Sequence, residues 1–441
     1  MKRLFLLLTL LIPFLITGSE REMQIIDILQ FGAKPNDLKD DTIAIQSAVD
    51  YAAKVRGIVK FPKGTFYINA NPHSGTIRLQ SNLQIQMDEE TILKVIPNQL
   101  SNYQIFNIYN QQNIKITGGT LVGDRYQHQG NTGEYGHGIY IGGEAKDIVI
   151  SNVRASNFWG DGFYIGGNET NGTYPSNITI TNCISDNNRR QGLSVTAGKN
   201  ITIQNSTFSN TNGTAPEAGI DIERNSPYQL PLENVILSNN TFNNNNGYGL
   251  MFVFTTENIA QNNSIQYNKK GGIFIGGEAE NTKTNKNLII ENKILNNGSS
   301  TSTTLNGNGI FVNFSSENTI KNNDISNNSQ NGIELLNNVN ENIIKNNTIQ
   351  NNKGAGVQIW GGSTNNNRII VQENTIQNNL ANGLNLSRVE TAQIIKNTFL
   401  NNRNLQIMMD RVYNSVIQEN VLKPNKMKTY NSKDNTIINN K

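Results

Sequence analysis

The sequence predicts an all-β solenoid, a stack of coils built from short parallel strands. The first observation is a motif of Gly, an apolar residue, a variable residue and a second apolar residue, which occurs at 138–141, 162–165, 219–222 and many later positions. Its alternation is the period-two pattern of a half-buried strand. The motif glycines recur at intervals of roughly 23 to 37 residues, a period that is typical of solenoids.

A second motif recurs once per expected coil and supports the same fold. It begins with Asn and continues with apolar or β-branched residues, as at 177–182, 200–205, 234–239 and 287–292. Parallel strands stack about 4.8 Å apart, so these Asn residues are expected to fall above one another at the corners. Asn tolerates left-handed backbone geometry and can hydrogen-bond to its stacked neighbours. The Asn-rich stretches are therefore predicted to be corner ladders and not disordered segments.

Composition limits the classes of function. The 441 residues carry a net charge of +3 with 16% charged residues, which does not indicate a surface for nucleic acid or for strong membrane attraction. Cys183 is the only cysteine, so no internal disulfide can form. Stability must then come from a stacked core, for which a chain of this length is ample.

The first residues indicate export. Lys2 and Arg3 precede an apolar run at 4–16 that is too short to span a membrane comfortably, and 17–19 supply small residues for cleavage. We therefore expect a signal peptide at 1–19 and a secreted protein, extracellular or attached to the cell surface, with no membrane association after cleavage. Residues 20–441 are predicted to form a single parallel β-helix domain, whose oligomeric state the sequence does not indicate.

Residues 20–70 lack the repeat pattern and are predicted to cap the N-terminal end. Asp40 or Asp41 suits the N-cap of a helix at 42–54. Two strands around a turn at 62–64 are expected to follow it. Because a solenoid exposes apolar core at its ends, an amphipathic helix here would cover that core. The helical face expected to do so is Ile43, Ile45, Ala48, Val49 and Ala52.

Three motifs lie in this cap segment: Phe31-Gly-Ala, Asp40-Asp-Thr and Phe61-Pro-Lys-Gly-Thr-Phe-Tyr. Together they resemble the N-terminal segment of the pectate-lyase-like superfamily, and the later repeats resemble its coils in style. The resemblance implies a single-stranded right-handed parallel β-helix of the pectin-lyase type, with an N-terminal capping helix. Lyases, hydrolases, epimerases and phage tailspikes share this architecture, so the resemblance indicates the fold and not the reaction.

Stacking of the Gly motifs in one sheet is expected to gather polar side chains on one face. These side chains lie just before a motif glycine or two residues after it. They are His137, Asp161 and Gln191 before the glycines, and Tyr140, Tyr164, Ser194 and Asp221 after them. Gly142 and Gly166 are expected to leave room beside them for a sugar ring. Later coils hold mostly Asn, Gln, Ser and Phe at these positions, so we expect the chemistry in the early coils.

Paired carboxylates on this face indicate glycoside hydrolysis, which needs one protonated acid and one base or nucleophile. Asp161 and Asp221 are two coils apart, roughly 9 to 10 Å, which suits an inverting arrangement. Asp221 and Glu223 are about 7 Å apart along one strand and form an alternative pair. The structural alternative is that Asp161 caps a turn and that Asp221, Glu223 and Arg224 are solvated charges.

Two segments of neighbouring coils, Trp159-Gly-Asp161-Gly and Arg190-Gln191-Gly, lie on the same face. The first resembles the acidic segment of polygalacturonases, with one Asp missing. The second occupies the place of their Gly-His-Gly segment and lacks its His. The Asn-Thr-Asp and Arg-Ile-Lys signatures of that family are absent, so the resemblance concerns the layout of a site more than pectin specificity.

The predicted site also includes the connection at 123–136, since loops of this kind often rim a groove. Its motifs resemble those of uncharacterised bacterial and phage β-helix proteins that we take to be glycan-active. Trp159 either stacks on a sugar or plugs a corner of the coil. The expected catalytic residues are Asp161, Asp221, Arg190 and His137, with Arg190 holding an anionic or hydroxyl group. The expected substrate-binding residues are Asp124, Arg125, His128, Glu134, Tyr140, Trp159, Tyr164, Arg189, Gln191, Glu223 and Arg224.

Three functions are compatible with this pattern, each with a polysaccharide as partner. The first is a glycoside hydrolase. The second is a polysaccharide lyase or C5-epimerase that uses Arg190, His137 or a Tyr as base near C5, with the uronate carboxylate neutralised by Arg or a cation. The third is a non-catalytic adhesin or glycan-binding solenoid. We expect no metal site in general, with calcium as a possible cofactor of a lyase; the particular polysaccharide is not encoded in any motif.

Overall fold

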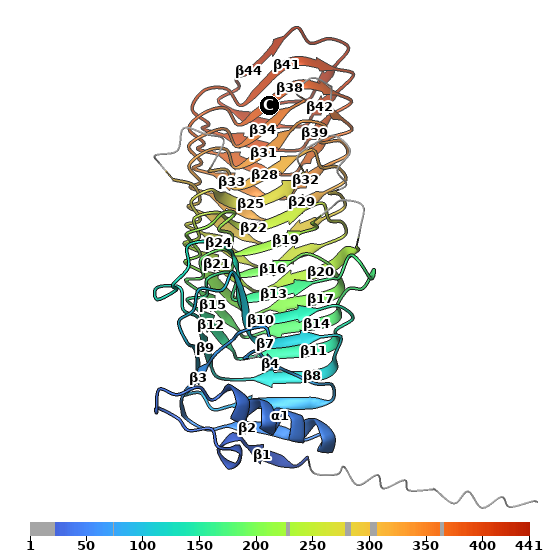
Figure 1. The fold of residues 1–441 in the computed structure, drawn as a ribbon. Helices are drawn as coiled ribbons and strands as arrows, with labels where there is room; N and C mark the ends of the chain where they lie inside the picture. Colours follow the sequence, from blue (N-terminus) through green and yellow to red (C-terminus); the bar gives the residue numbers. More distant parts are fainter. Residues whose placement is uncertain (1–22, 74, 226–229, 278–283, 300–306, 362–365) are drawn as a thin grey trace, which may run out of the picture.

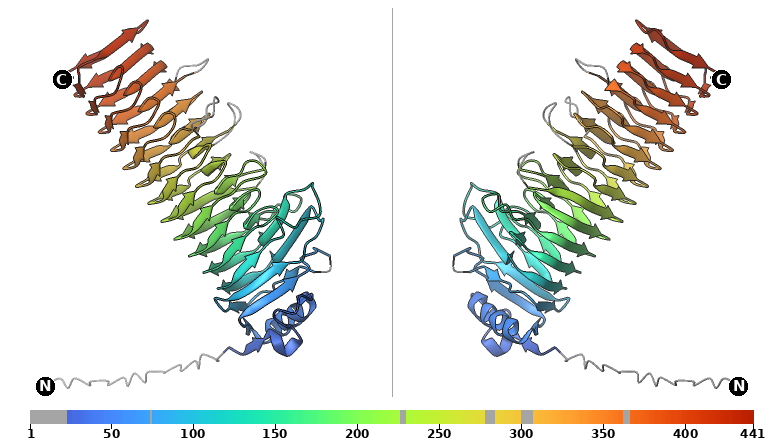
Figure 2. Two further views of the ribbon diagram at one scale, coloured as in Figure 1. Left: turned by 90° about the vertical axis from the view of Figure 1, so that its left-hand side faces the viewer. Right: turned by 90° about the vertical axis from the view of Figure 1, so that its right-hand side faces the viewer.

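The computed structural model describes residues 23–73, 75–225, 230–277, 284–299, 307–361 and 366–441, so the expected signal peptide at 1–19 lies outside the described residues. The described chain forms a right-handed parallel β-solenoid of about 13 coils, which confirms the predicted fold class (Figure 1). Each coil adds one strand to each of three parallel sheets, named here sheet A, sheet B and sheet C. Figure 2 shows the stack from its two sides, with the helix at one end and the last coils at the other.

The strand bounds follow the stack from the N-terminal end. Sheet A contains β1 (Ile25–Asp27), β2 (Ile58–Phe61), β5 (Leu83–Met87), β8 (Gln112–Thr117), β11 (Lys146–Ser151), β14 (Ser176–Thr181), β17 (Gly198–Gln204), β20 (Leu232–Ser238), β23 (Ile259–Gln261), β26 (Leu288–Ile290), β29 (Thr319–Lys321), β32 (Ile343–Lys345), β36 (Ile370–Gln372), β39 (Gln393–Ile395), β42 (Val416–Gln418) and β45 (Thr436–Ile438). Sheet B contains β3 (Gly64–Ile68), β6 (Thr91–Val95), β9 (Thr120–Val122), β12 (Arg154–Ser156), β15 (Ile184–Asp186), β18 (Thr207–Ser209), β21 (Thr241–Asn243), β24 (Ser264–Gln266), β27 (Lys293–Leu295), β30 (Asp324–Ser326), β33 (Thr348–Gln350), β37 (Thr375–Gln377), β40 (Thr398–Leu400) and β43 (Val421–Lys423).

Sheet C carries the Gly motifs and therefore the candidate site. It contains β4 (Ile77–Arg78), β7 (Asn102–Tyr109), β10 (Tyr135–Gly142), β13 (Phe163–Gly166), β16 (Leu193–Val195), β19 (Ile220–Glu223), β22 (Tyr248–Val253), β25 (Gly271–Gly276), β28 (Ile310–Asn313), β31 (Ile333–Leu336), β34 (Val357–Trp360), β38 (Leu384–Glu390), β41 (Ile407–Tyr413) and β44 (Met427–Tyr430), with the short β35 (Asn366–Asn367) pairing with β38. Apolar residues of all three sheets point inward and form one continuous core along the stack.

The helix α1 (Thr42–Val55) covers the N-terminal end of this core, as predicted, after a 3-10 turn η1 (Ile28–Phe31). The N-cap residue is Asp41, whose side chain makes no capping hydrogen bond, while the Asp40 carboxylate accepts the backbone N–H of Thr42 at 2.9 Å. Ile45, Ala48, Val49 and Ala52 are buried with Thr42. The placement of Ile43 on this face was wrong, because two residues of helical rotation turn it away from Ile45 and leave it 75% exposed. No helix among the described residues has the length and apolar character to cross a membrane.

Many corners contain two consecutive Asn residues, here called an Asn doublet, and the two residues have different roles. The first Asn of a doublet adopts left-handed geometry, as Asn239 does with φ of 58°. The second is buried and forms the ladder: the backbone N–H of Asn240 donates to the Asn263 side chain at 2.9 Å, and that of Asn263 donates to Asn292 at 2.9 Å. The predicted ladders are therefore confirmed, with the ladder residues inside the coil and the left-handed residues outside. In an earlier coil the buried, free Cys183 takes the inner place, and its N–H donates to Ser206 Oγ.

Candidate functional site

The strand register brings the predicted outward residues into one column. Tyr140 pairs with Tyr164, Tyr164 with Ser194, and Ser194 with Asp221, through β10, β13, β16 and β19. The backbone of Gly138 donates to the carbonyl of Asp161, and one coil later that of Gly162 donates to Gln191. The expectation that these residues share one region of sheet C is therefore confirmed in space.

Asp161 lies at the centre of the site and is fully buried. Its Oδ2 accepts hydrogen bonds from Arg190 Nη1 at 3.2 Å and from Ser194 Oγ at 2.9 Å, while its Oδ1 has no partner. Burial raises the pKa of Asp161 to about 6, against the opposing effect of the Arg190 charge. The carboxyl of Asp161 therefore changes charge close to neutral pH.

Arg190 lies between two carboxylates and reaches the surface. Its Nη1 contacts Asp161, and its Nε lies 3.5 Å from Glu134 Oε2. Burial acts to lower the pKa of Arg190, but the charges of Asp161, Glu134 and Asp221 outweigh it, so the pKa is raised. The side chain keeps 18% of its surface exposed. The site thus presents a permanently charged guanidinium whose position is fixed by its contacts with Asp161 and Glu134.

His137 is buried beside Asp161 and serves as an acceptor within the fold. The backbone N–H of Asp161 donates to His137 Nδ1 at 3.2 Å, and the imidazole stacks on Tyr164 with ring centroids 4.9 Å apart. Burial and the Arg190 charge lower the pKa of His137 to about 3. A neutral ring whose Nδ1 accepts carries its proton on Nε2. In this arrangement His137 offers a hydrogen-bond donor and no free lone pair.

Tyr140 and Tyr164 form a stacked pair with centroids 5.3 Å apart. Burial raises the pKa of Tyr140 to about 12 and also raises that of Tyr164, whose hydroxyl hydrogen-bonds with Thr196 Oγ1 at 3.0 Å. A β-carbon at Gly142 or Gly166 would collide with the rings of Tyr140 and Tyr164 respectively. The expectation that these glycines make room for a sugar was wrong, because the tyrosine rings fill that space.

Asp221 and Glu223 form a carboxyl pair on a single strand, β19. Burial, followed by the charge of Glu223 and a hydrogen bond with it, raises the pKa of Asp221 well above its usual value. Asp221 Oδ2 accepts from Gln191 Nε2 at 2.8 Å, and Gln191 Oε1 accepts the N–H of Ala218. Gln191 is fully buried, so it fixes Asp221 and does not reach the surface as a binding group.

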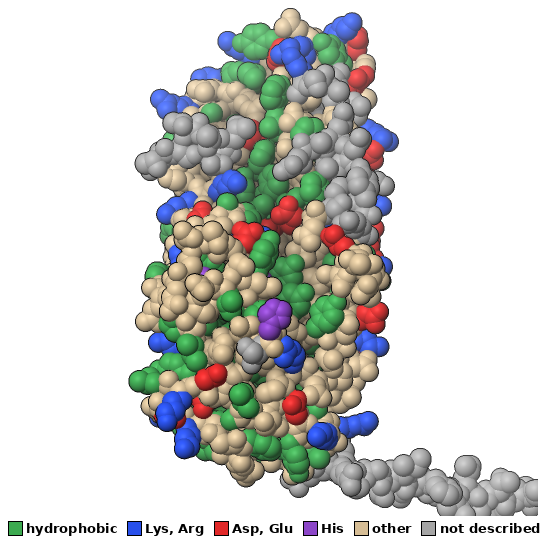
Figure 3. Space-filling model, in the orientation of Figure 1, with side chains coloured by type: hydrophobic (Ala, Val, Ile, Leu, Met, Phe, Trp, Pro, Cys, Tyr) green, Lys and Arg blue, Asp and Glu red, His purple; other side chains and the backbone are tan. Residues whose placement is uncertain are grey.

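Two cavities flank Arg190 on the outer face of sheet C, the face turned to the viewer in Figure 3. The first, of about 260 Å³, is lined by Arg190, Ser194, Thr196, Asp221, Glu223, Arg224 and Asn225. The second, of about 300 Å³, is lined by Pro72, Asn102, Gln104, Asn107, Tyr109, Tyr135, His137, Tyr140 and Tyr164. The hydrogen bond between Tyr164 and Thr196 joins the linings of the two cavities. We call them the charged pocket and the neutral pocket.

The loop before β10 forms a separate buried cluster. Asp124 accepts hydrogen bonds from Tyr103 Oη at 2.5 Å and from His128 Nδ1 at 2.8 Å. The His128 ring stacks on Trp159 at 4.1 Å, and the Arg189 guanidinium lies 3.8 Å from the centre of the Trp159 ring. The expectation that Asp124 and His128 rim the groove was wrong, because their polar groups are turned inward to hold this loop. Trp159 fills a corner of the coil in this cluster.

Arg125 and Arg189 also bind the protein itself. Arg125 donates to the backbone carbonyls of Asn187 at 2.8 Å and Asn212 at 2.6 Å, so it links its loop to two later coils. Arg189 Nη1 donates to the carbonyl of Gly133 at 3.0 Å. Arg224 lines the charged pocket. Of the predicted cations, Arg190 and Arg224 therefore face a pocket.

The amide side chains of β7 were missed. Asn107 pairs with Tyr140 and Gln104 with His137, which places both in the neutral pocket. The strand at 102–109 has no motif glycine, so the repeat pattern did not include it. Its alternation of polar Asn107 with apolar Ile108 and Phe106 was the signal that would have identified it.

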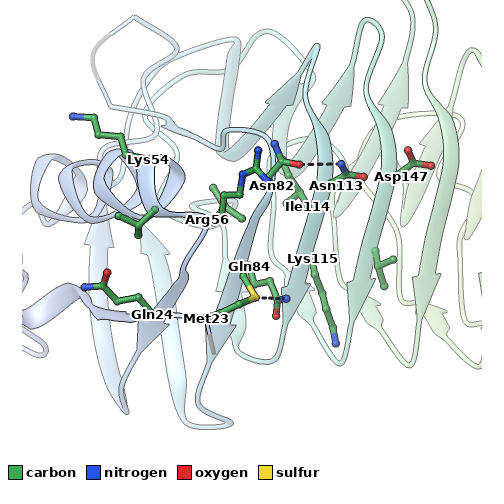
Figure 4. Close-up of a pocket in the computed structure, with 13 residues that line it drawn as sticks. Met23, Gln24, Lys54, Arg56, Asn82, Gln84, Asn113, Ile114, Lys115 and Asp147 are labelled. Carbon is green, nitrogen blue, oxygen red and sulfur yellow. Dashed lines mark hydrogen bonds between the residues drawn. The ribbon is translucent and has the colours of Figure 1, made fainter. Parts of the chain in front are cut away.

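A pocket of about 1070 Å³ lies away from this site, on sheet A beside the end of α1 (Figure 4). Its lining includes Lys54, Arg56 and Lys115, and a hydrogen bond of 2.9 Å joins Asn113 to Asn82 on its floor. With Asp147 as its one carboxylate among the described lining residues, this pocket lacks the acid–base groups of the sheet C face. Across the described residues, no group of three or more His, Cys, Asp or Glu is arranged to hold a metal ion.

The chain belongs to the family described as right handed beta helix region, whose model matches residues 65–231 and 308–441. YclG of Bacillus subtilis is 35% identical over 221 residues, which are 45% of this chain and 38% of YclG. Mannuronan C5-epimerase AlgE1 of Azotobacter vinelandii is 25% identical over 233 residues, 46% of this chain and 16% of AlgE1. The matched region thus spans 38% of the length of YclG and 16% of the length of AlgE1.

A likeness to a solved structure agrees with the fold. The A-module of mannuronan C-5 epimerase AlgE6 from Azotobacter vinelandii superposes with a TM-score of 0.63 at 18% identity, covering 94% of this chain and 98% of the module. At this identity the likeness concerns the fold alone. Together with the family match it supports the resemblance to pectate-lyase-like β-helices.

Proposed function

We propose that the protein is a polysaccharide-modifying enzyme that binds an acidic polysaccharide along the outer face of sheet C and exchanges or removes the C5 proton of a uronate. The observation that carries this proposal is Arg190, a charged guanidinium held by Asp161 and Glu134 between two pockets. The sequence similarity to a mannuronan C5-epimerase over nearly half of the chain supports it.

Arg190 supplies the electrostatic part of this chemistry. Breaking the C5–H bond leaves its electron pair on the carboxylate, as an enediolate with extra negative charge. A fixed cation beside that carboxylate stabilises the charge in the transition state. The hydrogen bonds to Asp161 and Ser194 hold the guanidinium in place before substrate arrives, so little reorganisation is needed.

Groups that exchange protons lie on both sides of Arg190. In the charged pocket, burial and Glu223 raise the pKa of Asp221, so this pair can accept a proton while it carries a negative charge. In the neutral pocket, the neutral phenol of Tyr164 can donate one. Removal from one side and return from the other inverts C5. If the C4–O4 bond breaks instead, the electron pair forms a C4–C5 double bond, and O4 leaves with the neighbouring sugar and takes the donated proton, which leaves an unsaturated product. On this proposal, the two pockets together supply a donor and an acceptor for either outcome.

Glycoside hydrolysis is the second candidate, favoured by the Asp221 and Glu223 pair. A carboxyl whose pKa is raised by burial and by a second carboxylate is suited to protonate a leaving oxygen. Asp161 is less suited as its partner, because it is fully buried and already accepts from Arg190 and Ser194. The inverting pair of Asp161 and Asp221 is therefore the weaker form of this candidate.

The test is to incubate the purified protein with a panel of polysaccharides in D₂O. We expect deuterium at C5 by NMR when C5 is reprotonated, or an unsaturated product absorbing in the ultraviolet when the sugar at O4 is lost, and loss of whichever signal is seen in Arg190→Gln. New reducing ends without deuterium or unsaturation would replace the proposal by hydrolysis. Binding without any chemical change would leave a glycan-binding protein.

We also propose that the protein is secreted after cleavage near residue 19. The support is the charged and apolar pattern of the first residues. N-terminal sequencing of protein from culture medium is expected to begin close to residue 20, and a start at Met1 would contradict secretion by cleavage.

A further inference from the structure

We infer that the face of sheet C selects a heteropolysaccharide in which an acidic sugar is flanked by uncharged sugars, and disfavours a polymer made only of uronates. This inference rests on the proposed function and narrows its substrate class. It comes from the charges of the two pockets and of the coils beyond them.

The neutral pocket has no charge to receive a carboxylate. None of the described residues that line it is Lys, Arg, Asp or Glu. Its polar groups are amides and phenols: Gln104 Nε2 donates to Asn102 Oδ1 at 2.5 Å, and Tyr109 Oη accepts from Asn168 at 2.7 Å. Amides and hydroxyls offer both donors and acceptors, which suits sugar hydroxyls. A carboxylate placed here would lose water without gaining a counter-charge.

The neighbouring cations lie outside the lining of the neutral pocket. Arg190 lines the charged pocket and contacts Asp161. Arg78 continues the outward column on the other side of Asn107, but it is not part of this lining and its Nη2 donates to the carbonyl of Pro72. A counter-charge for a uronate in the neutral pocket would therefore have to come from outside its lining.

The coils beyond Asp221 are also unsuited to carboxylates. The outward column continues as Met251, Phe274 and Phe311 in β22, β25 and β28. Phe274 contacts the ring of Phe311, with centroids 5.6 Å apart. The next member of the column is Glu334, which would repel an anion. Figure 3 shows this hydrophobic strip running up the middle of the face, with acidic side chains below it.

Among the described residues that line the two pockets, cations occur only in the charged pocket, at Arg190 and Arg224, so the pockets offer one position for an acidic sugar. The neutral pocket lies on one side of this position and the apolar strip on the other. A homopolyuronate brings one carboxylate for every sugar, so a chain that fills the groove would place carboxylates against amides and phenyl rings. A chain with neutral neighbours avoids that cost.

Mannuronan provides a defined test when its carboxyl groups are reduced to alcohols to different degrees. Binding of unreduced, half-reduced and fully reduced polymer to the protein is measured by calorimetry. We expect the half-reduced polymer to bind at least about tenfold more tightly than either of the others, since one misplaced carboxylate in a pocket is worth on the order of a tenfold change.

The variant Asn107→Lys adds a cation to the neutral pocket and tests the cause of the preference. We expect it to raise the affinity for unreduced mannuronan several-fold and to narrow the preference for the half-reduced polymer. Asn107→Gln is the neutral control. Asn385→Lys adds the same charge to the same column far along the stack, where Asn385 contacts Gln358, and is expected to leave the preference unchanged. Circular dichroism and thermal unfolding confirm that each variant is folded.

Equal or tighter binding of unreduced mannuronan by the parent protein would overturn the inference, as would an Asn107→Lys variant with an unaltered preference. Failure to bind the half-reduced polymer would also overturn it. Deuterium exchange at C5 is measured on a panel of polymers and does not depend on this preference. The proposed function can therefore stand when the inference fails, and the two failures are distinguished.

Discussion

The early coils of β10 to β19 and the late coils of β22 to β38 share one scaffold and differ in what they present. In both, the apolar residues of the Gly motif are buried, as Ile139 and Ile333 show. The early coils bury charge beneath the outer face of sheet C, at Asp161 and Asp221. The late coils present an apolar strip that includes Phe274 and Phe311.

The corners of the early coils are also less regular than those of the late coils. In the late coils, buried Asn residues form unbroken ladders, such as Asn292 to Asn323 to Asn347. In the early coils, Cys183 and Ser206 replace Asn in the corresponding ladder. Regular repeats favour stability, and sites of function are where local rules are broken. This difference suggests that the stability of the regular late coils offsets the free-energy cost of burying charged groups in the early coils.

Replacing the central cation is expected to have the largest effect on activity. Arg190→Gln removes the charge beside the developing enediolate, and loss of one such group lowers the rate by about 100- to 1,000-fold. Turnover is measured on whichever polymer the parent protein modifies. Arg368→Gln is the late-coil control, because its partner Glu341 lies in an exposed pair. Similar rates for the two variants would remove Arg190 from the chemistry.

Asp221→Asn is expected to have the next largest effect. The amide keeps the volume of the carboxyl and can still bond to Gln191, but it cannot share a proton with Glu223. Loss of a proton-transferring group typically lowers the rate by about 100-fold or more. Glu334→Gln is the matched control, since Glu334 lies in the same column of a late coil and bonds to Asn308 at 2.7 Å. If the two variants retained equal activity, the division between early and late coils would not be functional.

The pH dependence of the free energy of unfolding is expected to reflect the protonation of the Asp161 carboxyl. Its pKa is about 6 in the folded protein and about 3.8 unfolded, so protonation favours the folded state. This stabilisation is present below about pH 3.8 and is lost as pH rises through about 6. Between pH 4 and 6, the free energy of unfolding should fall by on the order of 2 kcal/mol more in the parent than in Asp161→Asn. Denaturant titrations that shift equally in both proteins would contradict the raised pKa.

The fold and the column of stacked outward side chains on sheet C could be predicted, because both depend on a motif that repeats along the sequence. The Gly motif identified which residues stack, so Tyr140, Tyr164, Ser194 and Asp221 were placed correctly together. The helix at 42–54 followed from its cap and its apolar spacing.

The roles of loop residues could not be predicted in the same way. The contact of Asp124 with Tyr103 and of Arg125 with Asn212 joins residues from different coils. No periodic pattern encodes these contacts, so the loop appeared to be free for substrate. Gln191 lies in the predicted column, but its side chain turns to Asp221, because the buried carboxyl needs a donor there.

The smallest effects on turnover are expected for the two members of one late Asn doublet, which differ in their effect on stability. Asn323 is the inner residue: its Nδ2 donates to the carbonyl of Ile289 at 2.9 Å and its Oδ1 accepts the N–H of Asn292. Asn323→Ala leaves these buried groups unpaired, at about 1 to 3 kcal/mol each. Asn322 is the outer residue with φ of 58°, so Asn322→Ala introduces left-handed strain of about 1 kcal/mol.

Asn322→Gly relieves that strain and is the control for the outer position. Denaturant unfolding should therefore rank Asn323→Ala as the least stable, then Asn322→Ala, then Asn322→Gly, which should lie near the parent. None of these changes is expected to alter turnover, because the doublet lies in a corner remote in sequence from Arg190 and contacts neither pocket. Equal losses at the two positions would show that the buried ladder contributes no more to the stability of the late coils than the tolerance of the outer Asn for left-handed geometry. A loss of turnover without a loss of stability would show instead that the late coils take part in the reaction.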